Sequence, residues 1–232
     1  MVALDLDRLG PACALARRLR GAAGLFKVGS QLFTAEGPRA IEKLAGLGFG
    51  IFLDLKFHDI PNTVAHAVAA AAALPKVRLM TLHATGGAAM MRAARAAVGG
   101  KKHRPALLAV TILTSLDATA LRHVGISGSP ASRAVALARL AKQSGLDGVV
   151  ASAHEARAIR RSCGPKFLIV VPGVRPASAS LNDQSRVATP AQAIRNGADY
   201  LVVGRPITAA ANPRKAALDI AEEIASVHRG SR

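Results

Sequence analysis

The sequence predicts an α/β fold, a single (β/α)8 or TIM barrel, in which eight parallel strands close into a cylinder inside a ring of helices. Three observations predict it. The chain has 232 residues, close to the roughly 250 that are typical of such a barrel. Short apolar runs alternate with helix patterns from one end of the chain to the other. No Pro- or Ser-rich linker interrupts them, so we expect one domain over residues 1–232.

Eight apolar runs have the character of parallel strands. They lack the strict alternation of a half-exposed strand, as expected for strands that are covered by helices on their outer face. The runs are Val2–Asp5, Leu25–Gly29, Gly50–Lys56, Leu79–His83, Ala106–Leu113, Gly148–Ala151, Phe167–Val171 and Tyr200–Val203. Eight strands favour a closed barrel over an open doubly wound sheet. No GxGxxG follows the first strand and no GxxxxGK occurs, so the common nucleotide-binding folds lose support.

Helix patterns fill the intervals between these runs. Local signals agree with them, because Thr189 followed by Pro190 is typical of a helix start, and Gly145 and Gly197 are suited to end helices. The predicted helices are Gly10–Arg20, Gly37–Leu47, Thr63–Leu74, Gly87–Val98, Ser132–Ser144, His154–Arg161, Pro190–Asn196 and about Pro213–Val227.

The composition predicts a soluble cytoplasmic protein. Half of the residues are apolar but only six are Phe, one is Tyr and none is Trp, so the core must consist of Ala, Val, Leu and Ile. Two cysteines, Cys13 and Cys163, are too few for a disulfide framework and favour a reducing compartment. Met1–Gly10 lacks the charged-then-apolar order of a signal peptide, and no apolar run approaches the ~18 residues of a membrane span.

The net charge of +17, from 31 Lys and Arg against 14 Asp and Glu, has three interpretations. It could serve nucleic-acid binding, attract an anionic substrate or be a solvated Arg-rich surface. The basic residues are spread over several predicted helices, and no aromatic residues lie among them to stack on bases. We therefore favour the solvated surface, expect no nucleic-acid partner and keep a basic nucleic-acid-binding protein as an alternative.

Charged residues follow the apolar strands at the end where barrels carry their chemistry. Asp5 and Lys27 end the first two runs, and Asp54 and Lys56 end the third, two residues apart and therefore on the same side of the strand. Asp59 follows in the loop. A lone buried charge is costly, so these groups must pair. An ion-pair network that only closes the barrel would explain one such charge, whereas an alternating set of four, Lys27, Asp54, Lys56 and Asp59, favours a catalytic site.

The loops after the seventh and eighth strands predict a phosphate site. Such loops often bind phosphate in barrels. The seventh strand leads into Arg175 and then into a long loop that contains Gln184, and the eighth ends in Gly204, Arg205 and Pro206. Glycine lets backbone N–H groups approach an anion, and Arg205 offers a forked donor. An ordinary turn at Gly204 and a surface charge at Arg175 are the alternative interpretation.

The third strand and the loop after it resemble a family signature. The segment Phe52-Leu53-Asp54-Leu55-Lys56-Phe57-His58-Asp59-Ile60-Pro61-Asn62-Thr63 is similar to that of the orotidine 5'-phosphate decarboxylase family. The wider superfamily shares only DxKxxD, and the IPNT extension is more specific. The resemblance covers nearly the whole chain and includes Val2–Asp5, Lys27–Gly29, Val110–Ser115, Pro172–Pro176, Asp183-Gln184 and Val203–Thr208.

The resemblance implies cofactor-free decarboxylation of orotidine 5'-phosphate (OMP) to UMP and CO2, a step of de novo pyrimidine biosynthesis. Lys56 would stabilise the carbanion at C6 of the pyrimidine and deliver the proton, and Asp54 would lie near the substrate carboxylate. Lys27 would hold Asp54 and the ribose, and Asp5 would accept hydrogen bonds from ribose hydroxyls. Thr114 would bind the pyrimidine edge.

The resemblance also implies a homodimer with shared active sites. Asp59 and Thr63 would reach into the neighbouring subunit's site, and Ile60 between them is assigned to substrate binding. Spacing alone leaves open that Asp59 folds back within its own chain. Arg175, Gln184, Gly204 and Arg205 would bind the nucleotide's phosphate end, and the loop Ala177–Arg186 is the expected lid.

The alternative within the superfamily is a Mg²⁺-dependent relative, such as 3-keto-L-gulonate-6-phosphate decarboxylase or hexulose-phosphate synthase. By resemblance, these relatives carry a metal-binding Glu after the second strand, where this sequence has Lys27. A cation at that place disfavours them. None of the seven histidines lies in an HExxH or other metal-ligand pattern, and we assign His58, His66 and His83 to packing or supporting roles. We expect no metal and no cofactor.

Overall fold

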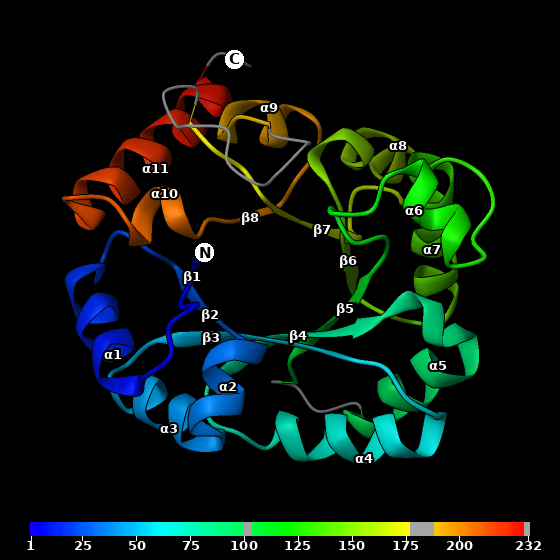
Figure 1. Ribbon diagram of the computed structural model, residues 1–232, viewed down its shortest axis with the longest axis horizontal. Helices are drawn as coiled ribbons and strands as arrows, with labels where there is room; N and C mark the ends of the chain where they lie inside the picture. Colours follow the sequence, from blue (N-terminus) through cyan, green and yellow to red (C-terminus); the bar gives the residue numbers. More distant parts are fainter. Residues whose placement is uncertain (100–103, 177–187, 230–232) are drawn as a thin grey trace.

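Eight parallel strands form one sheet in chain order, as shown in a computed structural model that describes residues 1–99, 104–176 and 188–229 (Figure 1). The strands are β1 (Val2–Ala3), β2 (Leu25–Gly29), β3 (Gly50–Phe57), β4 (Val77–His83), β5 (Ala106–Val110), β6 (Gly148–Val150), β7 (Leu168–Pro172) and β8 (Tyr200–Val202). The N–H of Ala3 donates to the carbonyl of Val203 at 2.9 Å and the N–H of Val203 donates to that of Met1 at 3.0 Å, so β8 joins β1. The predicted (β/α)8 barrel is confirmed. One domain over residues 1–232 stays a prediction.

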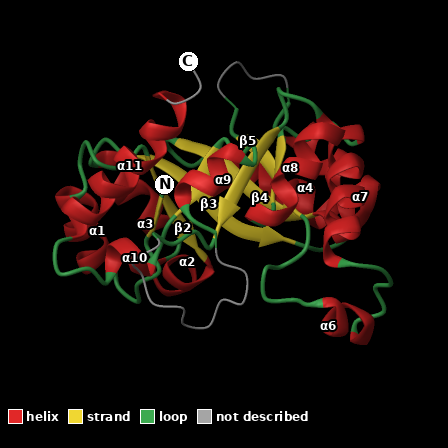
Figure 2. Ribbon diagram, turned by 90° about the horizontal axis from the view of Figure 1, so that it is seen from above, coloured by secondary structure: helices red, strands yellow, loops and turns green. Residues whose placement is uncertain are grey.

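Helices surround the strands (Figure 1). Eight of them match the predicted helices to within a few residues: α1 (Leu9–Arg18), α3 (Pro38–Gly46), α4 (Pro61–Ala72), α5 (Gly87–Ala97), α7 (Pro130–Gln143), α8 (Ala153–Cys163), α9 (Pro190–Arg195) and α11 (Pro213–Arg229). In the loops that the structure describes there are four short helices: α2 (Ser30–Glu36), the 3-10 turn η1 (Ala84–Gly86), α6 (Ala118–His123) and α10 (Arg205–Thr208). Figure 2 shows α6 extending away from the barrel on the connection between β5 and α7. No helix in the described ranges is both long and apolar enough to cross a bilayer.

The element bounds differ from the predicted ones where a cap or a loop intervenes. Helix α4 begins at Pro61 rather than at Thr63, because proline suits the first helical position. Helix α8 begins at Ala153, one residue earlier than predicted, and the Glu155 carboxylate in its first turn accepts a hydrogen bond from the N–H of Ser152 at 3.0 Å. Strand β5 ends at Val110 rather than at Leu113, because the chain turns there across the barrel mouth.

The barrel interior is packed with side chains. Six buried residues from six strands form its cluster: Ala3, Phe52, Leu79, Leu108, Val170 and Val202. A larger cluster of mainly Ala, Val, Leu and Ile fills the space between the strands and the helices. Phe52 and Val202 also line a pocket at the carboxyl ends of the strands, so the packed interior is the floor of that pocket.

Candidate active site

Four predicted residues form a continuous chain of ion pairs at the carboxyl ends of β1, β2 and β3. The Lys27 ammonium lies 2.8 Å from Asp5 Oδ1 and 3.7 Å from Asp54 Oδ2. The Lys56 ammonium lies 2.9 Å from the same Asp54 Oδ2. Asp54 therefore separates two ammonium groups, and Lys27 separates two carboxylates. The alternation lets four charges lie close together without net repulsion.

Burial divides these four residues into an inner and an outer pair. The side chains of Lys27 and Asp54 are only 10% and 11% exposed, whereas Lys56 is 34% and Asp5 is 51% exposed. The inner pair is held by its partners, since burying either charge alone would be costly. Of the two ammonium groups, Lys56 is the one that is both paired and accessible to a ligand.

An irregularity in β3 positions Lys56. Leu53 pairs with Met80 and Phe57 with Leu82, so three residues of β3 face a single residue of β4, Thr81. Lys56 has a φ of 51°, a left-handed conformation that is uncommon for a residue other than glycine. The hydroxyl of Thr81 accepts a hydrogen bond from the Lys56 backbone N–H and donates one to Asp54 Oδ1, both at 2.9 Å. Sequence reasoning missed Thr81, because a β-bulge leaves no trace in residue periodicity.

Gly29 is a second residue that sequence reasoning did not assign to the site. A Cβ at this position would lie 2.7 Å from Lys27 Nζ and 3.4 Å from Asp5 Oδ1. The glycine therefore leaves room for the Lys27 ammonium beside Asp5. Its place two residues after a strand-end lysine, on the same side of the strand, was the signal that could have found it.

Two adjoining pockets lie beside the ion pairs. The first, which we call the apolar pocket, has a volume of about 190 Å³ and is lined by Lys27, Asp54, Lys56 and Thr114 together with apolar side chains from β3, β5, β8 and the loop after β5. The second, the basic pocket, has a volume of about 220 Å³ and is lined by Asp5, Lys27, Arg175, Gly204 and Arg205 among others. Lys27, Pro172 and Val202 line both pockets. The site therefore suits an elongated ligand with a flat apolar end and an anionic end.

The predicted phosphate residues meet from two loops, as far as the structure describes them. Arg175 follows β7 and is 93% buried, since only 7% of it is exposed. Gly204 and Arg205 lie at the start of α10, after β8. Gln184 and the predicted lid Ala177–Arg186 lie outside the described residues.

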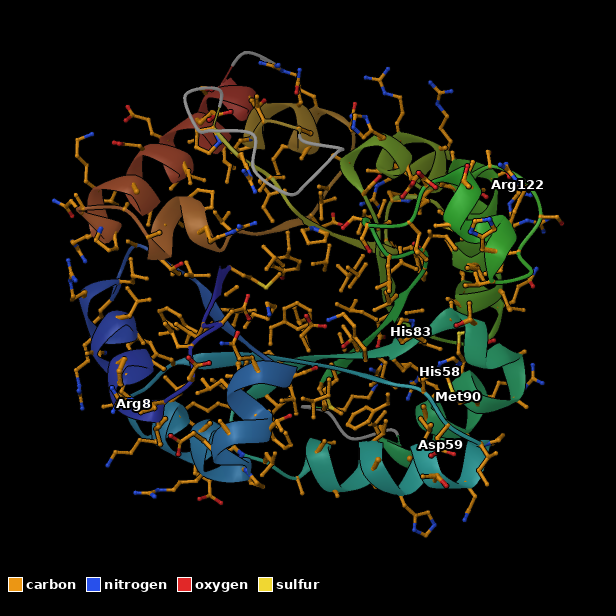
Figure 3. All side chains as sticks on the ribbon, in the orientation of Figure 1. Arg8, His58, Asp59, His83, Met90 and Arg122 are labelled. Carbon is orange, nitrogen blue, oxygen red and sulfur yellow. The ribbon has the colours of Figure 1, made fainter. Side chains whose placement is uncertain are left out.

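The loop after β3 does not join this cluster within the chain. Asp59, Ile60 and Thr63 are exposed, and none of them lines either pocket. Asp59 Oδ1 accepts a 2.6 Å hydrogen bond from the N–H of Ile60, and across residues 1–99, 104–176 and 188–229 it forms no ion pair. Figure 3 places Asp59 at the outer edge of the barrel, where α4 begins.

Two histidines lie near Lys56. The rings of His58 and His83 are 5.2 Å apart between centroids, and Figure 3 shows them next to each other near the end of β4. Burial lowers the pKa of His83 below its ordinary value, and the positive charges of His58 and Lys56 lower it further against the opposing effect of Asp54. This shift favours the neutral imidazole of His83 over the charged form. In the described part of the chain, no group of three or more His, Cys, Asp or Glu side chains could hold a metal ion.

This arrangement is suited to stabilise negative charge and to transfer a proton. An ammonium that is held by a carboxylate beside apolar walls interacts strongly with charge that develops next to it, because little water screens the interaction. Lysine carries three protons on one nitrogen, so the same group is also a general acid. The basic pocket offers a place for an anionic group away from that centre.

Comparison with known proteins agrees with this geometry. Residues 1–220 match the family described as Orotidine 5'-phosphate decarboxylase / HUMPS family. Proteins named orotidine 5'-phosphate decarboxylase from Nitrosococcus oceani and Trichlorobacter lovleyi are 49% and 53% identical, over 98% and 96% of this chain and 97% and 93% of their own lengths. A crystal structure of the Lactobacillus acidophilus protein of that name has a TM-score of 0.83 at 38% identity, over 96% of this chain and 97% of that one. The chain belongs to the orotidine 5'-phosphate decarboxylase / HUMPS family.

Proposed function

We propose that this protein decarboxylates OMP to UMP and CO2 without a cofactor. The observation that carries the proposal is the Lys56 ammonium, 2.9 Å from Asp54 and facing an apolar pocket that adjoins a basic one. The family description spans more than one activity, but the relatives at 49% and 53% identity carry the decarboxylase name. Lys27 also places an ammonium between Asp5 and Asp54, where a metal-dependent relative would need to hold a cation.

Lys56 performs the central step in this proposal. The bond between C6 and the carboxylate breaks, CO2 leaves and the electron pair stays on C6, where no ring position delocalises it. The Lys56 ammonium stabilises this carbanion and transfers one of its protons to C6, which gives UMP and a neutral amine that regains a proton from solvent. The apolar walls of the pocket, including Phe52 and Ile112, strengthen the charge interaction.

Asp54 has two tasks. It holds the Lys56 ammonium through Oδ2, and in the bound complex its carboxylate lies next to the carboxylate of the substrate. The negative charge beside the leaving group disfavours the bound substrate relative to the carbanion, whose charge is drawn towards Lys56. Thr114, which lines the same pocket, binds the pyrimidine edge.

The basic pocket receives the ribose and the phosphate. Asp5 and Lys27 line its inner side and bind the ribose hydroxyls, whereas Arg175, Gly204 and Arg205 line the side that receives the phosphate. We assign Gln184 to the same end of the nucleotide on its sequence context alone. Binding energy from the phosphate, which is remote from C6, orients the base against Lys56.

A UMP-formation assay on the purified protein tests the proposal. We expect turnover of OMP that is unchanged by EDTA, because no step of the proposed reaction uses a metal ion. We expect the Lys56→Ala variant to lose UMP formation by at least about 10⁴-fold, since it lacks both the charge and the proton. Loss of turnover in EDTA would favour the Mg²⁺-dependent relative, and normal UMP formation by Lys56→Ala would refute the role of Lys56.

We also propose a homodimer in which Asp59, Ile60 and Thr63 complete the partner's site. The segment 58–63 is exposed throughout, and Ile60 is 66% exposed, which is unusual for a large apolar side chain in this protein. Within the described residues Asp59 forms no ion pair with Lys56 of its own chain, so a second chain is the natural source of the acid. Asp59 of one protomer would then act beside Lys56 of its partner.

Mixing two inactive variants tests the shared site. We expect Lys56→Ala and Asp59→Asn each to be inactive alone. After they are unfolded together and refolded, we expect about a quarter of the wild-type activity, because half of the dimers are hybrids and each hybrid has one intact site. Separately refolded variants are the control. If mixing restores nothing, or if Asp59→Asn alone is fully active, Asp59 does not act across an interface.

An intracellular location is the remaining part of the proposal. Cys13 and Cys163 are both buried and free of a disulfide, and burial raises the pKa of each thiol. Protonated, enclosed thiols are compatible with a reducing compartment. Fractionation of cells that express the tagged chain, followed by immunoblotting, would place the protein.

A further inference from the structure

Thr81 links the two residues that carry the proposed chemistry. It lies in β4, is completely buried, and its one hydroxyl binds both the Asp54 carboxylate and the Lys56 backbone. We propose that Thr81 is a positioning residue, which fixes the Lys56 ammonium against C6 of the substrate without touching the substrate itself. This inference rests on the proposed decarboxylation and assigns to it a residue outside the signature segment 52–63.

The bulge in β3 creates the need for such a residue. Between the pairs Leu53–Met80 and Phe57–Leu82, three residues of β3 face one of β4, so regular ladder hydrogen bonds are lost there. A buried backbone N–H without a partner would be costly. The Thr81 hydroxyl replaces the missing ladder partner of Lys56 at 2.9 Å. The Thr81 side chain therefore supplies the hydrogen bond that the bulge removes from the ladder between β3 and β4.

The same hydroxyl determines how Asp54 is oriented. The Lys56 N–H donates to Thr81 Oγ1, and the single hydroxyl proton then points at Asp54 Oδ1. With Oδ1 engaged, Oδ2 is the oxygen that meets both ammonium groups, at 2.9 Å from Lys56 and 3.7 Å from Lys27. Three hydrogen bonds therefore form a ring: from the Lys56 N–H to the Thr81 hydroxyl, from this hydroxyl to the Asp54 carboxylate, and from the Lys56 ammonium to the same carboxylate.

This ring of hydrogen bonds also holds Lys56 in an unfavourable backbone conformation. A φ of 51° is disfavoured for a side chain with a Cβ, and such residues persist only where their surroundings fix them. Release of the Lys56 N–H would let the backbone relax and move the ammonium away from its place. A displacement of about 1 Å at a reacting group is enough to lower a rate by ~10²-fold.

Thr81→Val and Thr81→Ser test the proposal. Valine keeps the shape of threonine and removes the hydroxyl, whereas serine keeps the hydroxyl. We expect Thr81→Val to lower kcat about 10- to 100-fold with KM for OMP changed by less than about 3-fold, because the lost contact acts on the transition state. We expect Thr81→Ser to restore most of kcat.

Ligand binding provides a readout that a purely structural role would not change. A uridine monophosphate with an anionic oxygen on C6 resembles the carbanion, whereas UMP does not. We expect Thr81→Val to weaken binding of the anionic analogue by about the factor that kcat loses, and to leave UMP binding unchanged.

Thr111→Val is the matched control. Thr111 is also a buried threonine, directly after the neighbouring strand β5, and its hydroxyl donates to the Val150 carbonyl rather than to the charged residues. We expect this variant to lose thermal stability as Thr81→Val does, with kcat within about 3-fold of wild type. If Thr81→Val and Thr111→Val lower kcat equally, or if Thr81→Val lowers binding of both ligands alike, Thr81 is structural only. If the wild-type protein forms no UMP, the proposed function fails instead.

Discussion

The two ends of the barrel use the same kinds of charge for different purposes. At the carboxyl end, Asp54 lies between Lys27 and Lys56. At the amino end, Asp147 and Asp199 directly precede β6 and β8, and each pairs with an arginine. Acid and cation are close together at both ends, so proximity alone does not distinguish a catalytic cluster from a structural one.

The arginines of the amino end are fully engaged by the fold. Arg104 donates two hydrogen bonds of 2.6 Å to Asp147, and Asp147 also accepts a hydrogen bond from the backbone N–H of Leu107 at 2.8 Å. Arg160 binds Asp199 at 2.6 Å together with four backbone carbonyls, and Asp199 accepts the N–H of Ile169. Burial raises the pKa of Asp147, but Arg104 and the Leu107 N–H outweigh it, so the pKa lies below its ordinary value.

The comparison of the two ends shows that the hydrogen bonding of the cationic side chains matters more than the volume of the cavity beside them. A cavity of about 740 Å³ at the amino end is larger than the apolar pocket or the basic pocket and is lined by Asp147, but both oxygens of this carboxylate already accept hydrogen bonds from Arg104. The Lys56 ammonium lines the apolar pocket, and among the residues that the structure describes its one hydrogen-bond partner is Asp54. A bidentate arginine stabilises the fold, whereas a lysine ammonium with protons that are not hydrogen-bonded can take part in a reaction.

Among the changes that test this comparison directly, Lys56→Arg has the largest expected effect. The charge stays, but an arginine does not give up its proton, and its fork does not fit the space of an ammonium. We expect kcat to fall by at least about 10³-fold while the thermal midpoint stays near that of the wild type. The measurements are UMP formation and thermal unfolding. Activity above a tenth of wild type would mean that charge alone suffices.

Arg104→Lys applies the reciprocal change to the amino end. The charge stays and the bidentate contact with Asp147 is lost, so we expect the free energy of unfolding to fall by about 2 kcal/mol. We expect kcat and KM for OMP to remain as in the wild type, because the pair lies at the opposite end from Lys56. Denaturant unfolding and steady-state kinetics measure the two quantities. Unchanged stability would contradict a structural role for the fork.

The pH dependence of stability gives the smallest effect. The folded-state pKa of His83 lies below that of the unfolded chain, so between these two values the unfolded chain binds more protons and stability falls as pH decreases. We therefore expect His83→Asn to lose less stability than the wild type on going from pH 7.5 to about pH 5. Thermal midpoints across this range measure it, with His66→Asn on the exposed face of α4 as control. Parallel curves for His83→Asn and wild type would contradict the pKa direction.

The sequence predicted those parts of the molecule that depend on local pattern. The strand-end charges Lys27, Asp54 and Lys56 were predictable, because parallel strands bring their carboxyl ends together and a two-residue spacing keeps side chains on one side. Thr81 and Gly29 were not, because their roles depend on a bulge and on the space beside one ammonium. Helices α2 and α6 span only seven and six residues, too few for a clear periodicity. Whether Asp59 reaches a neighbouring site depends on a second chain.

The closure of the sheet makes the basic pocket a junction between the beginning and the end of the chain. Ala3 and Asp5 come from the first strand and its loop, and Gly204 and Arg205 follow the last strand. More than 190 residues of sequence separate these walls, and the hydrogen bonds that Val203 forms with Ala3 and Met1 hold them together. A nucleotide bound across both walls, as proposed, would bind only the closed barrel and would therefore raise the stability of that form.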